Sequence, residues 1–136
     1  MTATEREAVR DRAANRCEYC HLRQEHFPTY RHQIEHVVPK KHGGSDDPNN
    51  LALACIRCNL AKGPNLTGID PDTGKVVVLF HPRTQAWDEH FAMVGAEVVG
   101  LSPAGRASVA VLNMNEDVRL NLREELLENG ELTEDG

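Results

Sequence analysis

Four cysteines in two matched pairs suit a bound metal ion. Each pair has the spacing Cys-x-x-Cys, and 34 residues separate the pairs, whose members are Cys17, Cys20, Cys55 and Cys58. Two thiolates separated by two residues can bind one ion, because a tight turn directs both sulfurs the same way. Four thiolates fill a tetrahedral site, so the spacing predicts a structural zinc ion. Two disulfides or a redox pair are alternatives, but a single redox site would not need a second matched pair.

A second group of residues suits hydrolysis of a phosphodiester. Glu35 and His36 are adjacent, Asn50 lies in a turn, and Asn59 directly follows the last cysteine. The reaction needs a base that deprotonates water and a cation on the phosphate oxygens. A neutral imidazole can be that base, while a carboxylate and an amide oxygen suit a hard ion such as Mg²⁺. Each residue is ordinary alone, and their placement around the cysteines is what favours catalysis.

The length of 136 residues predicts one domain over residues 1–136. Only 4% of the residues are aromatic, so zinc binding, which can supply on the order of 10 kcal/mol, would help the small core to fold. The start of the chain is rich in charge, without the apolar segment of a secretion signal, and nowhere do 18 apolar residues run together. We therefore expect a cytoplasmic protein with no membrane partner, and that reducing compartment favours metal over disulfides.

Charge is unevenly distributed along the chain, whose formal net charge is −6. Residues 1–65 contain ten Lys and Arg against eight Asp and Glu, together with five of the seven histidines. Residues 66–136 contain five Lys and Arg against thirteen Asp and Glu. The cysteine-bearing half is therefore mildly basic and the other half is acidic. Tight non-specific binding to duplex nucleic acid is not expected, since it depends on phosphates neutralised by Lys and Arg.

The residues that would do chemistry lie on short elements separated by turns. Propensities, caps and turn residues predict four such elements: a helix over residues 4–15 with Thr4 as N-cap, a strand over 34–38, a polar loop over 40–50, and a helical turn over 59–62 that stops at Gly63.

Residues 64–136 predict an extension of further strands and helices. Its expected elements are a turn over residues 70–74, a buried strand over 75–80, a short helix over 87–91, a strand over 96–101, and a final helix capped by Asn115 that ends before Gly130. Residues 103–113 show no clear period.

The motifs of residues 17–63 resemble those of the zinc-containing HNH endonucleases in order and spacing. They are Cys17-x-x-Cys20, Glu35-His36-Val37-Val38-Pro39, Gly43-Gly44, Asn49-Asn50-Leu51, Cys55-x-x-Cys58-Asn59 and Lys62-Gly63. A later segment is similar to the tail of small stand-alone members of the family, namely Leu79-Phe80-His81-Pro82-Arg83 through Trp87 and His90-Phe91. The resemblance implies an α+β protein with a ββα-metal, treble-clef-like core around one catalytic divalent ion, followed by the C-terminal extension.

The resemblance also implies a role for each matched residue. His36 matches the general base, and Asn50 matches the residue that holds the loop so that this imidazole is oriented. Glu35 and Asn59 match the ligands of the catalytic ion, Mg²⁺ or Mn²⁺, although Asp is more frequent than Glu at the first position. Lys62 matches a basic residue that can contact a substrate phosphate, and a charge at the helix C-terminus is its alternative role.

Two hypotheses of different classes follow. The first is a metal-dependent endonuclease that hydrolyses DNA phosphodiester bonds, with RNA open as another substrate. The second is a non-catalytic, zinc-stapled module that binds nucleic acid or protein. His36, Asn50 and Asn59 favour the enzyme, because a binding module needs no base beside a hard-metal ligand pair. Glu35 and the negative charge favour the module. The sequence does not predict the target sequence, the oligomeric state, or whether the protein nicks one strand or cuts both.

Overall fold

The structure, a computed structural model, describes residues 1–132. The chain divides into two compact units. The N-terminal unit comprises Met1–Leu66 and His81–Ala86, and the C-terminal unit comprises Thr67–Phe80 and Trp87–Gly136. The single domain expected over residues 1–136 stays a prediction, and the end of that range, 133–136, lies outside the described residues.

The N-terminal unit is built on a two-stranded antiparallel sheet. β1 (Gln33–His36) pairs with β2 (Leu51–Ala54), so that Glu35 lies opposite Ala52 and His36 opposite Leu51. β1 overlaps the strand predicted over residues 34–38 and ends two residues earlier. Both strands are joined by the predicted polar loop, which contains the two 3-10 helices Lys40–His42 and Pro48–Asn50.

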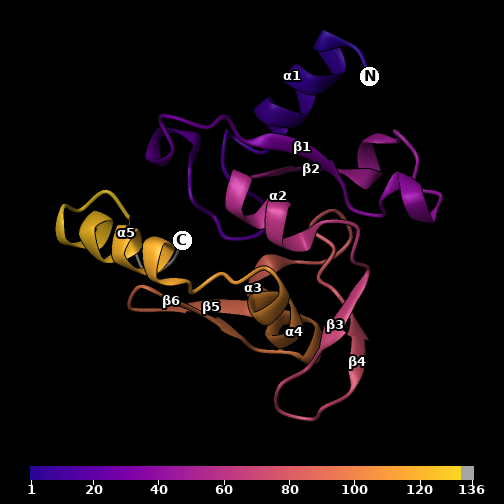
Figure 1. The fold of residues 1–136 in the computed structure, drawn as a ribbon. Coiled ribbons are helices and arrows are strands. Elements are labelled where there is room, and N and C mark those ends of the chain that lie inside the picture. The colour runs from indigo at the N-terminus through magenta and orange to yellow at the C-terminus, as the bar shows by residue number, and fades with distance from the viewer. Residues whose placement is uncertain (133–136) are drawn as a thin grey trace. The chain divides into compact units, whose positions relative to one another are not determined.

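Two α-helices flank this sheet in the chain. α1 (Ala3–Arg12) packs against it, and the residues that share this core are Val9, Ala13, Leu51 and Leu53, with Ile34 at the margin. α2 (Ile56–Lys62) follows β2 directly and ends at Gly63, as predicted. In Figure 1 the chain runs from α1 through β1 and β2 to α2. A further 3-10 helix, Gln24–His26, lies in the segment before β1.

The cap predicted for α1 is wrong by two residues. Thr2 rather than Thr4 is the N-cap, and its hydroxyl accepts from the Glu5 amide at 3.1 Å. The Glu5 carboxylate in turn accepts from the Thr2 amide at 2.7 Å, which completes a capping box. The sequence contains two overlapping Thr-x-x-Glu patterns, and pattern alone does not choose between them.

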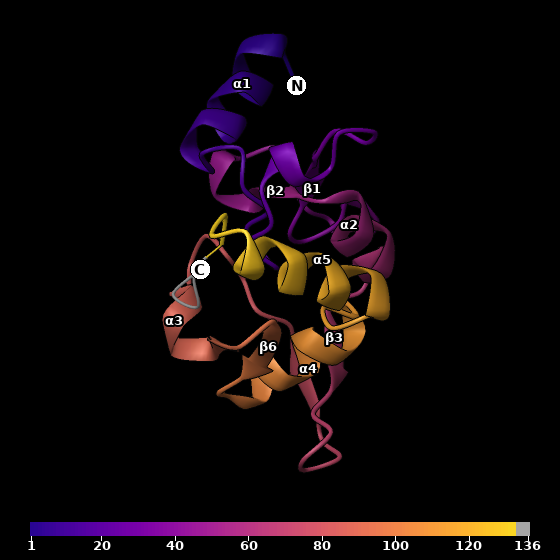
Figure 2. The ribbon, with the colours of Figure 1, turned by 90° about the vertical axis from the view of Figure 1, so that its left-hand side faces the viewer.

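The C-terminal unit contains two antiparallel hairpins and three helices. The hairpins pair β3 with β4 and β5 with β6. In order, the elements are β3 (Thr67–Ile69), β4 (Val76–Val78), α3 (Trp87–His90), β5 (Phe91–Val94), β6 (Glu97–Gly100), α4 (Pro103–Val111) and α5 (Asp117–Glu128). Figures 1 and 2 show α4 beside β6 and β3, which are its main contacts. The predicted mixture of helices with short strands is therefore confirmed.

The buried strand predicted over residues 75–80 is wrong. Val76 and Val78 are 66% and 70% exposed, and only Leu79 and Phe80, which follow β4, are buried. β4 pairs with β3 alone, so one face of the hairpin is turned to solvent and the side chains alternate in burial. An unbroken apolar run does not reveal this difference from a strand in a larger sheet.

The sequence signals after β6 are misleading in two places. Residues 103–113 contain α4, whose N-cap Ser102 accepts from the Gly105 amide and whose first residue is a proline. Asn115 does not cap α5; its amide instead bonds both backbone groups of Val98, each at 2.8 Å. No helix within residues 1–132 is long and apolar enough to cross a membrane.

Candidate active site and metal centre

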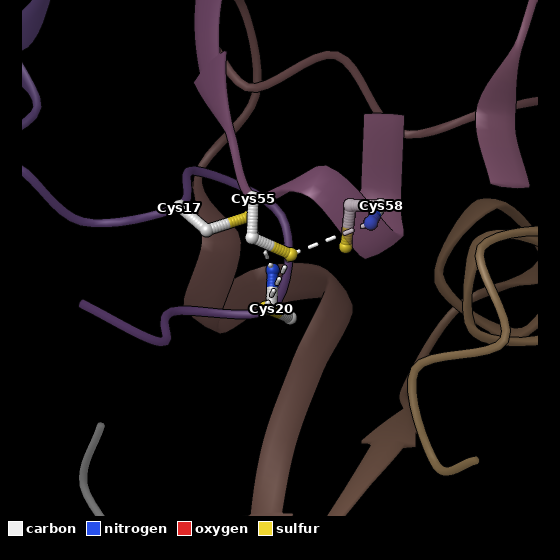
Figure 3. Close-up of side chains that lie close together, drawn as sticks. All are labelled: Cys17, Cys20, Cys55 and Cys58. Atoms are coloured by element: carbon white, nitrogen blue, oxygen red, sulfur yellow. Dashed lines mark hydrogen bonds between the residues drawn. The ribbon is translucent and has the colours of Figure 1, made fainter. Parts of the chain in front are cut away.

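Four buried sulfur atoms converge where the turn between Cys17 and Cys20 meets the start of α2. The Sγ atoms of Cys17, Cys20, Cys55 and Cys58 all lie within 4.8 Å of one another, and Figure 3 shows their side chains pointing toward a common centre. The Cys20 and Cys55 sulfurs are 3.7 Å apart. Zn–S bonds of about 2.3 Å place tetrahedral sulfurs about 3.8 Å apart. The donor set therefore fits one zinc ion.

Backbone amides support the same cluster. The Cys20 amide donates to the Cys17 sulfur at 3.4 Å, and the Cys58 amide donates to the Cys55 sulfur at 3.3 Å. Burial raises the pKa of the Cys17 and Cys58 thiols well above the ordinary value. Buried thiols of this kind would be costly to ionise without a cation, and a bound metal ion supplies that charge. The structure contains no disulfide between these four cysteines, so the disulfide alternative finds no support in it.

Glu35 lies in a buried group of three side chains. It is 6% exposed, one carboxylate oxygen accepts from the Tyr19 hydroxyl, and the other lies 3.1 Å from the Lys62 ammonium. Burial is the main influence on the Glu35 pKa, which it raises, while the Lys62 charge opposes that shift. Both oxygens of the predicted metal ligand thus have partners within the protein, with which a bound ion would have to share them.

His36, the next residue on β1, is more accessible and has a different partner. Its Nε2 atom lies 2.6 Å from the Oδ1 atom of Asp46, in the loop between the strands. The Lys40 ammonium lies 3.5 Å from the same carboxylate oxygen. Neighbouring strand residues point to opposite faces, which is why Glu35 and His36 meet different surroundings.

An open pocket of about 310 Å³ brings three predicted site residues together. Glu35, His36 and Asn59 line it, with walls that include Pro39, Lys40 and Pro64. β1 supplies the carboxylate and the imidazole, and α2 supplies the amide. The pocket therefore contains a possible base beside two oxygen donors, the combination that metal-assisted hydrolysis requires.

Comparison with known proteins identifies this part of the chain. Residues 17–65 match the family model described as HNH endonuclease. Residues 17–65 thus carry the sequence pattern of an HNH endonuclease domain. No curated protein and no solved structure matched the chain. The family match supports nuclease activity and metal binding in general terms, and it covers every site residue predicted from the sequence.

Asn50 of the HNH domain lines no part of the pocket and holds the loop beside it. Its side-chain amide donates to the carbonyls of Val38 and Ser45 at 3.0 and 2.9 Å, and its carbonyl accepts from the Val38 amide at 2.8 Å. These bonds join Val38, two residues beyond the end of β1, to the part of the loop that carries Asp46. The predicted orienting role of Asn50 is compatible with this geometry, but no bond runs directly between Asn50 and the His36 ring in the described residues.

Lys62 also lies outside the pocket lining. Its side chain is 2% exposed, and its ammonium donates to the Val37 carbonyl at 2.9 Å in addition to the pair with Glu35. The predicted contact with a substrate phosphate stays a prediction, and in this geometry it would require the ammonium to leave two buried partners.

Sequence reasoning missed Tyr19 and Asp46. Tyr19 lies between the first two cysteines and reaches Glu35 sixteen residues later, while Asp46 follows the Gly43-Gly44 turn and reaches His36. The available signals were the aromatic residue between the first two cysteines and the acidic residue two positions after Gly44. Neither signal identifies the partner, because the partner lies on a different element of the HNH domain.

Proposed function

We propose that this protein is a metal-dependent endonuclease that hydrolyses DNA phosphodiester bonds. The observation that carries the proposal is the meeting of Glu35, His36 and Asn59 in one open pocket of the HNH domain. The order of a strand pair followed by a helix, β1, β2 and α2, supports the ββα-metal core that the family resemblance implies. The cytoplasmic location and the preference for DNA over RNA are predictions from the sequence.

Each residue has a part in the proposed reaction. Cys17, Cys20, Cys55 and Cys58 hold a structural zinc ion, which leaves no ligand position for substrate. Glu35 and Asn59 would hold the catalytic Mg²⁺ or Mn²⁺, whose charge, when bound, stabilises the phosphate oxygens and the leaving oxygen.

His36 does the proton chemistry. As a neutral imidazole it accepts a proton from water, and the resulting hydroxide attacks phosphorus while the bond to the leaving 3′ oxygen breaks. The electron pair of that bond stays on the leaving oxygen, which is then protonated from solvent. Asn50 keeps the loop in place during this step through its bonds to Val38 and Ser45.

A second candidate is a zinc-stapled module that binds nucleic acid or protein without cutting it. The observation that favours it is the state of Glu35, whose two carboxylate oxygens already have partners in Tyr19 and Lys62. In a pure binding module this buried group would serve stability alone. Dependence on a divalent ion separates the two candidates, because only the nuclease needs one beyond zinc.

Nicking of supercoiled plasmid tests the proposal. Zinc-loaded wild type is compared with Mg²⁺, with Mn²⁺ and in EDTA under conditions where measured zinc content is retained, alongside His36→Ala and the control His26→Ala, whose ring bonds only the Arg23 amide among the described contacts. We expect cleavage only with a divalent ion and a loss of about a hundredfold or more in the His36 variant alone. A folded wild type that leaves the plasmid intact in every metal, or a His36 variant that cuts at the wild-type rate, would reject the assignment.

A further inference from the structure

The contact between Asp46 and His36 assigns a role to a residue that the HNH motif does not include. We propose that Asp46 is a positioning residue that fixes the orientation and tautomer of the His36 ring, so that Nδ1 is the atom that takes the proton from water. The effect on rate rests on the proposed nuclease function, while the state of the ring can be measured without it.

Hydrogen-bond chemistry determines which nitrogen of the His36 ring carries the proton. An aspartate carboxylate is ionised at neutral pH and can only accept. At 2.6 Å from the carboxylate, the Nε2 atom of His36 must therefore carry the proton. A neutral imidazole has one N–H and one lone pair, so the lone pair resides on Nδ1. When Nδ1 accepts a proton from water, the Asp46 carboxylate faces the positive ring that forms.

Asp46 is held in place through its neighbours in the loop. The carbonyl of the residue before it, Ser45, receives a hydrogen bond from the Asn50 amide, and the same amide donates to the carbonyl of Val38, two residues after β1. Gly44 lies so close to Val38 that a Cβ at position 44 would lie 1.7 Å from the Val38 carbonyl oxygen. The loop is therefore fastened to the segment that carries His36.

These contacts give the middle residue of the HNH motif a route to the base. Asn50 bonds Val38 and Ser45. The residue after Ser45 is Asp46, which bonds the His36 ring. Lys40 contacts the same Asp46 oxygen at 3.5 Å and lines the pocket, so it limits the directions in which the carboxylate can turn. Asp46 itself is 44% exposed, which makes it open to substitution without disturbing the core.

The test uses Asp46→Ala, Asp46→Asn and the control Asp47→Asn in full-length, zinc-loaded protein. Asp47 lies next to Asp46, and its carboxylate oxygen accepts from the Asn49 amide, a bond that an asparagine oxygen can also accept. Circular dichroism and zinc content check that each variant is folded. The ring nitrogens of His36 are observed in ¹⁵N-labelled protein by long-range ¹H–¹⁵N NMR and are assigned from the signals lost in His36→Ala.

We expect wild type and Asp47→Asn to show His36 protonated at Nε2. In Asp46→Ala this single tautomer should give way to a mixture, and plasmid nicking should lose about tenfold or more in kcat with little change in KM. Asp46→Asn can turn its NH₂ group toward Nε2 and so favour the other tautomer, and it should therefore lose kcat as Asp46→Ala does. A wild-type ring protonated at Nδ1, or an Asp46→Ala variant with an unchanged tautomer and kcat, would overturn the inference. If the NMR result holds but wild type does not cut DNA, the proposed function fails and the role of Asp46 in fixing the ring stands.

Discussion

The Lys62 ammonium lies 3.1 Å from the Glu35 carboxylate, and both side chains are almost fully enclosed in the N-terminal unit. Charges buried in this way are stable only as a pair, because removal of one leaves the other without compensation. The two residues come from α2 and β1, so their contact also fixes the helix against the strand that carries the proposed site.

Lys62→Met is therefore expected to lower the free energy of unfolding by about 3–5 kcal/mol, the usual cost of breaking a buried pair from one side. Denaturation by urea of the zinc-loaded protein measures this change. Lys41→Met, at an exposed position, is the control and should stay within about 0.5 kcal/mol of wild type. Equal stability of the two variants would mean that the ion pair contributes nothing.

Tyr19→Phe tests the other contact of the buried carboxylate. The substitution removes the hydroxyl that donates to Glu35 and keeps the ring in place. We expect a loss of about 1.5–3 kcal/mol, typical of a hydrogen bond to a charged group, with zinc content unchanged. Tyr30→Phe is a matched control, since Tyr30 is exposed. The result that contradicts the assignment is a Tyr19 variant as stable as the Tyr30 variant.

Removal of zinc should unfold the N-terminal unit. Native mass spectrometry is expected to find one zinc ion per chain. The Cys58→Ser variant should lose this ion, and hydrogen exchange should show that the amides of β1, β2 and α2 lose their protection. The basis is a contribution on the order of 10 kcal/mol from a four-thiolate site. Full alkylation of the denatured, unreduced protein should find four free thiols. Detection of two disulfides, or intact protection after chelation, would refute a structural zinc ion.

The ion pair of Asp70 with Arg106 predicts how acid affects the C-terminal unit. Two guanidinium nitrogens donate to the two carboxylate oxygens at 2.8 Å, and these bonds hold the pKa of Asp70 well below its ordinary value. A carboxyl whose pKa falls on folding binds fewer protons in the folded state, so it stabilises that state at neutral pH. The contribution is lost as pH falls below about 5 toward the lowered pKa.

Arg106→Met should consequently be less stable than wild type at pH 7, and the difference should shrink as the solution is acidified. Asp72→Asn serves as the control, because Asp72 also contacts Arg106, at 3.1 Å, but is 67% exposed. Its effect should be small at every pH. Urea denaturation at a series of pH values makes the comparison. A stability difference between Arg106→Met and wild type that stays constant with pH would contradict a stabilising role for the ionised Asp70 carboxylate.

Prediction from the sequence succeeded where spacing along the chain carries the information. The Cys-x-x-Cys pairs specify a four-sulfur cluster because two short turns supply four like ligands, and the structure gathers those sulfurs. The stop of α2 at Gly63 was likewise predictable, since glycine there adopts a φ of 49°. The match of residues 17–65 to the HNH endonuclease family model was predictable from the same local motifs.

Prediction was weaker where partners lie on different elements. Lys62 was expected to contact a substrate phosphate or to provide a charge at the helix C-terminus, and nothing local shows that a carboxylate on β1 would pair with it in the interior. Asn115 looked like a cap because asparagine favours that position, yet it satisfies the backbone of Val98 on another strand. In both cases tertiary contacts overrode a local preference.

The buried group of Tyr19, Glu35 and Lys62 has an evolutionary consequence. Its three members come from the turn between Cys17 and Cys20, from β1 and from α2. A single substitution therefore leaves a buried charge or hydroxyl without its partner. Glutamate at position 35 has one more methylene than the aspartate frequent in the HNH family, and in this chain its longer side chain meets both partners. Among relatives of this chain, the three positions should therefore change together, and a relative with Asp at position 35 should also differ at the tyrosine or the lysine.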